Sequence, residues 1–280
     1  MTTKVESSEN SLAAIPDVMR INHSYNSDNK DILRLLPDKS ISLFLEDMPY
    51  NTTQSHFEYE VDLVQYWANR LHKIKDNGVF ALFADEPFTS RLIQSNLDMF
   101  IIRITWDKET DRNALNAYKM PLKRTEDIVI FSPAKVGTFT YNPVLTPKDR
   151  NNIRPRKTGK TTQKQSCYGT AKGLSAEQWQ EDKKMPTNLV SFSAAAGNCN
   201  SINRIHVNQK PVELLRYVIQ LFTNVGDLVF DGYSGSGSTA VASHLENRNY
   251  IICEKSEIEF KKQQSYLKTE INPVLGFHYV

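Results

Sequence analysis

The chain has 280 residues, of which 40% are hydrophobic, 24% charged and 10% aromatic, a composition typical of globular proteins rather than disordered or fibrous ones. Its three cysteines, Cys167, Cys199 and Cys253, show no C-x-x-C spacing, which argues against a disulfide framework and a zinc site. No apolar run approaches the roughly 18 residues that span a bilayer, and the polar start lacks the apolar segment of a signal peptide. We therefore expect a cytoplasmic protein with no membrane partner and no metal.

The net charge of +2 is distributed unevenly. Residues 134–200 contain eleven Lys or Arg and four acidic residues, a local excess of +7, so the remainder of the chain carries −5. Such segregation is expected where one region faces a polyanion. A solvated basic loop would give the same pattern, so the charge alone does not establish nucleic-acid binding.

Strands and helices alternate in the first half of the chain. Residues 1–20 are polar and predict a flexible arm. The predicted elements are then a buried strand at 41–45, a helix at 61–74 that Asp76-Asn77-Gly78 ends, a strand at 79–84, a helix at 88–98, and strands at 99–106 and 128–131. This alternation predicts a parallel or mostly parallel sheet with helices on both faces.

The pattern is interrupted and then resumes. Residues 134–205 are rich in Pro, Gly, Thr, Gln and Asn, show little periodicity and are interpreted as an inserted segment. The elements predicted after it are a helix that Pro211 opens, a strand at 228–231, a glycine-rich loop at 232–237, a helix at 238–245, a strand at 250–253 and a helix at 257–268.

The glycine-rich loop indicates a nucleotide-like cofactor. It reads Asp231-Gly232-Tyr233-Ser234-Gly235-Ser236-Gly237, and glycines before a helix let backbone amides approach a ligand. Residues 235–240 also match G-x-G-x-x-A, and Glu254 follows Gly235 by 19 residues, so a nicotinamide-dependent oxidoreductase is one interpretation. A carboxylate at Asp231 would oppose a pyrophosphate, however, and fits the ammonium of a cofactor with an amino acid part, while Glu254 could accept both ribose hydroxyls.

A second loop, Asp47-Met48-Pro49-Tyr50, follows the first predicted strand. Ligands bind at the carboxyl ends of parallel strands, so this loop should lie beside the glycine-rich loop. Asp47 and the Met48 carbonyl could accept the two N–H groups of an exocyclic amine, and Tyr50 could stack on the ring that carries it. A plain turn after a strand would give the same four residues.

Together these motifs resemble the amino-methylating DNA methyltransferases, the N6-adenine and N4-cytosine enzymes that use S-adenosylmethionine. The resemblance covers the chain from Ser27 to about Lys268, except the basic insert, and is strongest over 208–215 followed by Gly226-Asp227 and 231–240. Residues 104–108 and 124–131 are also similar to the family. With the catalytic loop first, then the recognition region, then the cofactor loop, the order is similar to that of the permuted β group.

The resemblance implies an α/β, Rossmann-like methyltransferase fold, with a mostly parallel central sheet flanked by helices and an inserted target recognition region. The implied division is a flexible arm at 1–20, the first part of the catalytic domain at 21–133, the target recognition region at 134–205, and the second part of the catalytic domain with a C-terminal tail at 206–280.

The family's site residues carry over onto matching positions. Asp47, Met48, Pro49 and Tyr50 would hold the target amine. Lys210 and Pro211 would belong to the helix that closes the methionine pocket, and Asp28 would contact the cofactor adenine. The implied cofactor residues are Asp28, Lys210, Pro211, Asp231, Gly232, Tyr233, Ser234, Gly235, Ser236, Gly237 and Glu254. The residues expected to contact DNA are Lys148, Arg150, Arg154, Arg156, Lys157 and Lys160.

Two positions depart from the family pattern. Met48 stands where the family usually has proline, which is expected to cost the loop some rigidity, although Pro49 still biases Met48 toward an extended conformation. Gly232 and Tyr233 stand where the family usually has Pro-Phe. We expect cofactor binding to persist, because Tyr233 keeps the aromatic ring.

The predicted function is site-specific transfer of a methyl group from S-adenosylmethionine to N6 of an adenine flipped out of double-stranded DNA. Asp47 at the first loop position favours adenine, since serine is more usual there in cytosine-N4 enzymes. The alternatives are an N4-cytosine methyltransferase and a catalytically inactive DNA-binding relative. The resemblance implies a bacterial or phage-encoded protein, and leaves open two further partners, a second copy of the chain and a cognate restriction enzyme.

Overall fold

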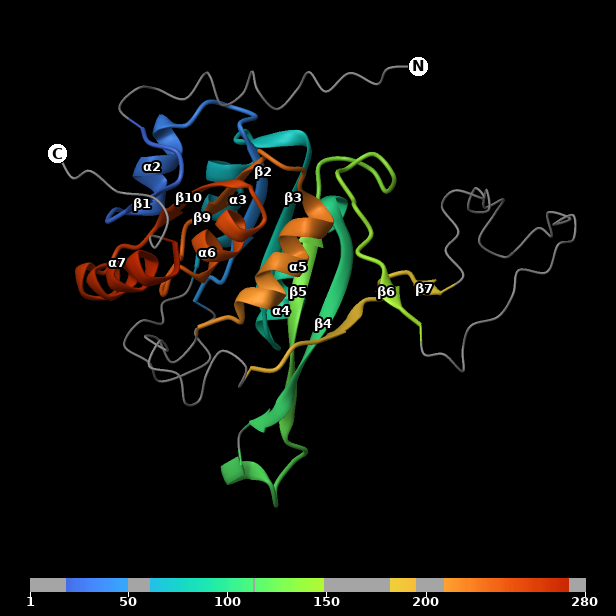
Figure 1. Cartoon of the computed structure of the whole chain (residues 1–280). Helices are drawn as coiled ribbons and strands as arrows, with labels where there is room; N and C mark the ends of the chain where they lie inside the picture. The colour runs from blue at the N-terminus through green and yellow to red at the C-terminus, as the bar shows by residue number, and fades with distance from the viewer. Residues whose placement is uncertain (1–18, 50–60, 113, 149–181, 195–208, 272–280) are drawn as a thin grey trace, which may run out of the picture. The chain divides into compact units, whose positions relative to one another are not determined.

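The computed structural model describes residues 19–49, 61–112, 114–148, 182–194 and 209–271. The chain divides into a larger unit, Met1–Asn142 with Asn188–Val280, and a smaller unit, Pro143–Thr187. In the smaller unit, β6 (Thr146–Pro147) pairs antiparallel with β7 (Lys183–Lys184). The larger unit contains the sheet and the helices (Figure 1).

The described strands of the larger unit form one eight-stranded sheet in the order β1-β10-β9-β2-β3-β5-β4-β8. Their bounds are β1 (His23–Tyr25), β2 (Ile41–Glu46), β3 (Ile74–Ala84), β4 (Phe100–Arg112), β5 (Lys123–Phe131), β8 (Leu189–Ser191), β9 (Leu228–Asp231) and β10 (Asn249–Cys253). The two pairs made by β5 are antiparallel and the other five are parallel. The predicted mostly parallel sheet is therefore confirmed.

Helices cover both faces of the sheet, as expected. The bounds are α2 (Asn29–Leu35), α3 (Leu63–Arg70), α4 (Phe88–Ser95), α5 (Val212–Phe222), α6 (Ser238–Leu245) and α7 (Glu257–Ile271). Successive side chains of β10 point to opposite faces: Ile251 packs in one core cluster with residues of α2, α3 and α4, whereas Ile252 packs in another with residues of α6 and α7. Helix α5 packs beside α6 (Figure 1).

The predicted end of the first long helix is wrong. The helix ends at Arg70, and Asp76-Asn77-Gly78, expected as its stop, lies inside β3. Ile41 of β2 pairs with Ile74 and Leu43 pairs with Val79, so two residues along β2 correspond to five along β3. The turn-forming triplet is thus absorbed as a bulge, because pairing with the neighbouring strand outweighs its local preference.

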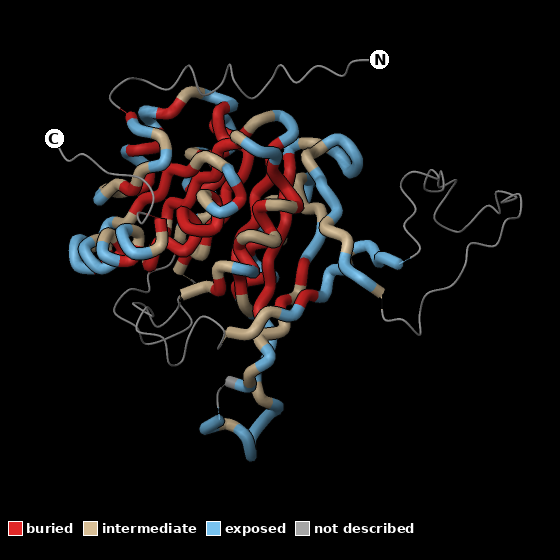
Figure 2. The backbone as a smooth tube through the Cα atoms, viewed as in Figure 1, coloured by how far each residue is buried: buried red, intermediate tan, exposed pale blue. Residues whose placement is uncertain are grey.

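Strands β4 and β5 are longer than their apolar segments predicted. Their polar continuations pair antiparallel, with Asp107 opposite Thr125 and Arg112 opposite Lys123. Figure 1 shows this pair extending beyond the other strands, and Figure 2 shows that its far end is exposed. Backbone pairing therefore continues past the point where burial of apolar side chains ends.

The core lies along the central strands. All six residues of β2 are buried, and Phe44 stacks on Phe80 of β3 with 4.8 Å between ring centroids. Burying one such ring stabilises the fold by about 1.5–3 kcal/mol. Figure 2 shows this buried centre, from which the parallel strands run to the edge of the sheet.

Candidate active site

The two predicted loops meet at one edge of the sheet. Strands β10, β9 and β2 are adjacent and parallel, so the residues that follow them share an edge. Asp47 follows β2, the loop 232–237 follows β9, and Glu254 follows β10. A hydrogen bond joins the last residue of β2 to the start of the glycine-rich loop, because the Gly232 N–H donates to Glu46 Oε1 over 3.0 Å.

The glycine-rich loop depends on two left-handed backbone positions. Gly235 has φ 45° and Gly237 has φ 83°, a region that strongly favours glycine. A Cβ atom on Gly237 would also lie 2.8 Å from Gln263 Cγ of α7. The Gln263 amide donates to Ser234 Oγ over 2.8 Å and to the Gly235 carbonyl over 2.9 Å. Hydrogen bonds from Gln263 of α7 therefore fix the conformation of the loop.

Asp231 is a buried carboxylate at the start of this loop, and it is 4% exposed. It accepts hydrogen bonds from Thr239 Oγ1 at 2.6 Å and from the Tyr233 N–H at 2.9 Å, both neutral donors. Burial, with smaller contributions from the Glu46 and Asp47 charges, raises the pKa of the Asp231 carboxyl to about 8 despite these two donors. A bound cation would stabilise the ionised form, so the site fits an ammonium group.

A second buried polar atom is suited to a group that donates N–H. Among the residues that the structure describes, Gln209 Oε1 is a buried side-chain oxygen with no hydrogen-bond partner. A buried acceptor without a donor costs about 1–3 kcal/mol. A ligand that donates N–H groups would remove this cost.

Asp28 and Glu254 lie at the other end of the predicted cofactor site. Asp28 caps α2, accepting from the Lys30 N–H at 3.0 Å, and pairs with Lys255 Nζ at 3.1 Å. Burial would raise the pKa of the Asp28 carboxyl, but these two contacts hold it below its usual value. Asp28, Tyr233 and Lys255 line a cavity of about 240 Å³. Glu254 accepts the Gly235 N–H over 3.1 Å and so touches the glycine-rich loop.

The catalytic loop begins with a charged contact. Asp47 Oδ2 lies 2.7 Å from Lys210 Nζ. Met48 is 1% exposed and packs in the core, so its buried side chain anchors the loop where the family pattern has a proline ring. Tyr50 lies outside the described residues.

A buried ionic network stands behind both loops. Glu46 is fully buried and accepts three hydrogen bonds from Arg70, one from Nη2 at 2.9 Å and two from Nε at 3.0 and 3.3 Å. Tyr66 donates to the same carboxylate over 2.5 Å. Arg70 also donates to Asn29 Oδ1, and Asn29 donates to the Gly232 carbonyl over 3.1 Å. The network thereby connects β2, α2 and α3 to the start of the cofactor loop.

The network explains why glycine occupies position 232. A Cβ atom there would lie 2.8 Å from Glu46 Oε1, 2.8 Å from Asn29 Cβ and 3.0 Å from Arg70 Nη2. A proline would also lack the N–H that Glu46 accepts. The departure from the family pattern at this position therefore fits the carboxylate at position 46.

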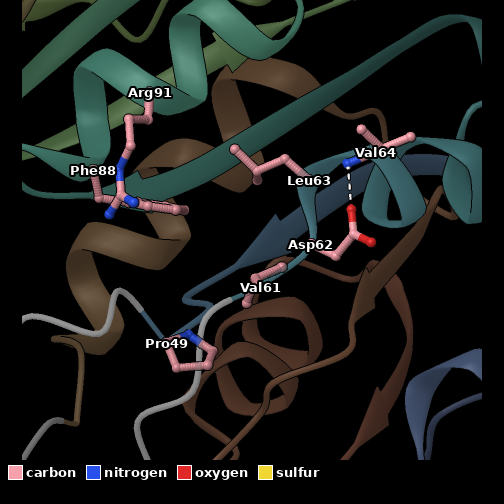
Figure 3. Close-up of a pocket in the computed structure, with 7 residues that line it drawn as sticks. All are labelled: Pro49, Val61, Asp62, Leu63, Val64, Phe88 and Arg91. Atoms are coloured by element: carbon pink, nitrogen blue, oxygen red, sulfur yellow. Dashed lines mark hydrogen bonds between the residues drawn. The ribbon is translucent and has the colours of Figure 1, made fainter.

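A cavity of about 450 Å³ opens beside Pro49 (Figure 3). Its lining residues are Pro49, Val61, Asp62, Leu63, Val64, Phe88 and Arg91. They come from the catalytic loop, from the start of α3 and from α4. The lining is mainly apolar and contains one guanidinium, which lies 5.8 Å from the Phe88 ring centroid.

The pattern of a family described as DNA methylase (N6_N4_Mtase) matches residues 21–264. The chain belongs to this family of N6/N4 DNA methylases. The resemblance predicted from the two loops is confirmed, and the methylase is a DNA methyltransferase whose family uses S-adenosylmethionine as methyl donor.

Relatives match most of the methylase. Type II methyltransferase M1.MboII from Moraxella bovis is 26% identical over 270 residues, which cover 91% of this chain and 99% of the relative. The structure of M1.HpyAVI with SAM has a TM-score of 0.56 at 18% identity, covering 88% of this chain and 98% of that one. The PvuII DNA methyltransferase (cytosine-N4-specific) has a TM-score of 0.56 at 16% identity, covering 88% and 91%. These structures confirm the predicted fold.

Of the residues expected to contact DNA, only Lys148 lies in the described part of the methylase. Its backbone N–H donates to the Asp182 carbonyl over 2.7 Å. Arg150, Arg154, Arg156, Lys157 and Lys160 lie outside the described residues. Within the predicted recognition region 134–205, residues 134–142 and 188–194 belong to the larger unit, where β8 pairs with β4.

Two properties of the described ranges bear on the expectations about metals and membranes. They contain no cluster of three or more His, Cys, Asp or Glu side chains arranged for a metal ion. None of their helices has the length and apolar character needed to cross a membrane.

Sequence reasoning missed four charged residues around the two loops: Glu46 and Arg70 of the ionic network, and Glu126 and Lys108, which extend the contact of Lys210 with Asp47. A signal for Glu46 was present, because a carboxylate directly after the apolar run 41–45 requires a buried partner. The partner itself was not predictable, since Arg70 looks like an ordinary solvent-facing residue of a helix. Lys108 and Glu126 lie in segments similar to the family, but neither had an assigned role.

Proposed function

We propose that this methylase transfers a methyl group from S-adenosylmethionine to N6 of an adenine in a specific DNA sequence. The observation that carries the proposal is the carboxylate of Asp47 at the end of β2, beside the buried Asp231 of the cofactor loop on the neighbouring strand. One carboxylate is placed for a target amine and the other for a cofactor ammonium.

The cofactor is assigned to the edge formed by β9, β10 and β1. Asp231 and Gln209 Oε1 would accept from its ammonium. Glu254 would accept its ribose hydroxyls, and the cavity lined by Asp28 and Tyr233 would hold its adenine. The family resemblance assigns Lys210 and Pro211, which directly precede α5, to the border of this site.

The target amine is assigned to the catalytic loop. Asp47 and the Met48 carbonyl would each accept one of its N–H groups, which favours the pyramidal nitrogen of the transition state. The nitrogen would then attack the methyl carbon directly, the carbon–sulfur bond would break to leave a neutral thioether, and the methylated nitrogen would release one proton to solvent. No covalent enzyme intermediate is needed, and alignment of the two reactants supplies much of the rate.

The cavity beside Pro49 supports a flipped nucleotide. Its volume of about 450 Å³ and its apolar lining, including Phe88, suit a planar base, and Arg91 suits a phosphate (Figure 3). A base reaches such a cavity only after it leaves the duplex stack. Phosphate contacts are assigned to the basic residues of the region 134–205, among them Lys148, Arg154 and Arg156.

The test is incubation of the methylase with labelled S-adenosylmethionine and unmodified DNA, followed by digestion to nucleosides and mass analysis. N6-methyl-2′-deoxyadenosine is the expected product. N4-methylcytosine would overturn the choice of base and keep the mechanism, an outcome that the likeness to a cytosine-N4-specific enzyme makes worth measuring. Bound cofactor with no label on DNA would indicate a DNA without the recognised sequence, an RNA substrate or the inactive relative.

The role of Asp47 has its own test. Asp47→Ala should abolish transfer and leave cofactor affinity within about twofold, since loss of such a contact costs on the order of 10²–10³ in kcat. Asp38→Ala removes an exposed carboxylate that pairs with Lys73 and serves as the control. An active Asp47→Ala variant would refute the assignment.

A further inference from the structure

Four side chains of alternating charge form a line that begins at Asp47. Lys210 Nζ lies 2.7 Å from Asp47 Oδ2 and 2.8 Å from Glu126 Oε1. The other oxygen of Glu126, Oε2, lies 2.7 Å from Lys108 Nζ. The four residues come from the end of β2, the segment before α5, β5 and β4. Four segments far apart in the sequence thus form one chain of ion pairs that ends at the Asp47 carboxylate.

The line is largely withdrawn from water. The side chains of Glu126, Lys210 and Lys108 are 6%, 14% and 17% exposed. Burial would raise the pKa of the Glu126 carboxyl, but Lys210 and Lys108 hold it below its usual value. Burial would likewise lower the pKa of the Lys210 ammonium, yet Asp47 and Glu126 raise it well above its usual value. Lys210 and Glu126, the two inner members of the line, are therefore each kept in the charged form by the opposite charges on both sides.

Aromatic rings confine the ammonium groups. Lys210 Nζ lies 4.9 Å from the centroid of the Phe83 ring, and Lys108 Nζ lies 5.3 Å from the Trp106 ring. Phe83 and Trp106 pack edge to face at 6.4 Å. The Trp106 indole N–H donates to the Phe192 carbonyl over 2.8 Å, which fixes the second ring. The ammonium of Lys210 is thus held by two carboxylates and one ring face.

We propose that Lys210 is a positioning residue for Asp47, and that Glu126 and Lys108 hold Lys210 in place. The proposal rests on the function proposed above, in which Asp47 accepts the target amine. It differs from the role that the family resemblance implies, which places Lys210 with the cofactor. A carboxylate that must meet an N–H at a fixed angle gains from a fixed partner on its other side, since a displacement of about 1 Å costs on the order of 100-fold in rate.

The test compares Lys210→Met with Lys210→Arg in single-turnover methyl transfer, together with cofactor affinity from calorimetry. Lys210→Met should lower the transfer rate at least about tenfold and change the cofactor Kd less than about twofold. Lys210→Arg keeps the positive charge between the two carboxylates and should recover part of the rate. A Lys210→Met variant that weakens cofactor binding and keeps its rate with saturating cofactor would return Lys210 to the cofactor site and overturn the proposal.

A double-mutant cycle tests the outer members. Glu126→Gln and Lys108→Met should each lower the rate, and the double variant should be no slower than Glu126→Gln alone, because Lys108 acts only through Glu126. Losses that multiply in the double variant would show two separate effects and contradict a single line.

Lys75→Met is the matched control. Lys75 is also mostly buried, 15% exposed, and pairs with Asp227 at 3.0 Å. Lys75 lies at the amino end of β3 and Asp227 directly precedes β9, so this pair is at the edge of the sheet opposite the two loops. This variant should lose thermal stability and keep its transfer rate. An equal loss of rate in Lys75→Met would assign the effect of Lys210 to stability.

The two proposals fail in different ways. If the wild-type methylase transfers no methyl group to DNA, the proposed function fails. If the wild type is active and Lys210→Met keeps the wild-type rate, the positioning role alone fails.

Discussion

The ion pair between Glu46 and Arg70 gives the sharpest prediction about stability. The two side chains are 0% and 1% exposed and lie 2.9 Å apart. Arg70→Met leaves the Glu46 carboxylate buried with neutral donors from Tyr66 and Gly232. Removing one partner of such a pair typically costs about 3–5 kcal/mol, because the remaining charge is uncompensated. We expect a loss of this size in the free energy of unfolding.

The assay is urea denaturation followed by tryptophan fluorescence, on Arg70→Met and on the double variant Glu46→Gln/Arg70→Met. In the double variant neither charge of this pair remains buried, and the glutamine oxygen can still accept the Gly232 N–H. It should therefore be more stable than Arg70→Met by at least about 1 kcal/mol, the scale of a coupled pair.

The matched control is Arg34→Met, which removes an arginine paired with Asp31 on the surface, with side chains 77% and 62% exposed. Its effect should stay within about 0.5 kcal/mol. The reasoning would be refuted if Arg70→Met changed stability no more than this control, or if the double variant were no more stable than Arg70→Met.

Three further predictions concern ligand binding, and a fourth concerns the pH dependence of stability. The raised pKa of Asp231, about 8, predicts that cofactor affinity falls as pH drops below 8. Cofactor binding below this pH should release the proton of the Asp231 carboxyl, which calorimetry in two buffers would measure. Asp231→Asn should remove both effects. The same shift means that the protein without cofactor loses stability as pH rises from about 4 to about 8, because the folded state holds the proton more tightly, which thermal unfolding at several pH values would show. Gly232→Ala should weaken cofactor binding, since its Cβ would lie 2.8 Å from Glu46 Oε1, and unchanged affinity by calorimetry would contradict the contact. Charge reversal at Arg154 and Arg156 should lower DNA affinity and its salt dependence, as filter binding at several salt concentrations would reveal.

The local elements followed from the sequence where burial sets a clear period. The apolar runs of β2, β9 and β10 and the amphipathic face of α5 each satisfy one local rule. The bulge at Asp76-Asn77-Gly78 was missed because strand pairing overrode the turn preference of this triplet. The polar ends of β4 and β5 were missed because backbone pairing there needs no apolar side chain.

The sequence by itself determined the family, the fold class and the two loops that meet at the edge of the sheet. Each of these depends on residues close together in the chain, such as the four of the catalytic loop or the seven of the cofactor loop. Only the tertiary structure decided that Lys210 contacts Asp47 and that Arg70 contacts Glu46. Such contacts depend on strand order and register, which bring distant segments together and leave no periodic trace in the sequence.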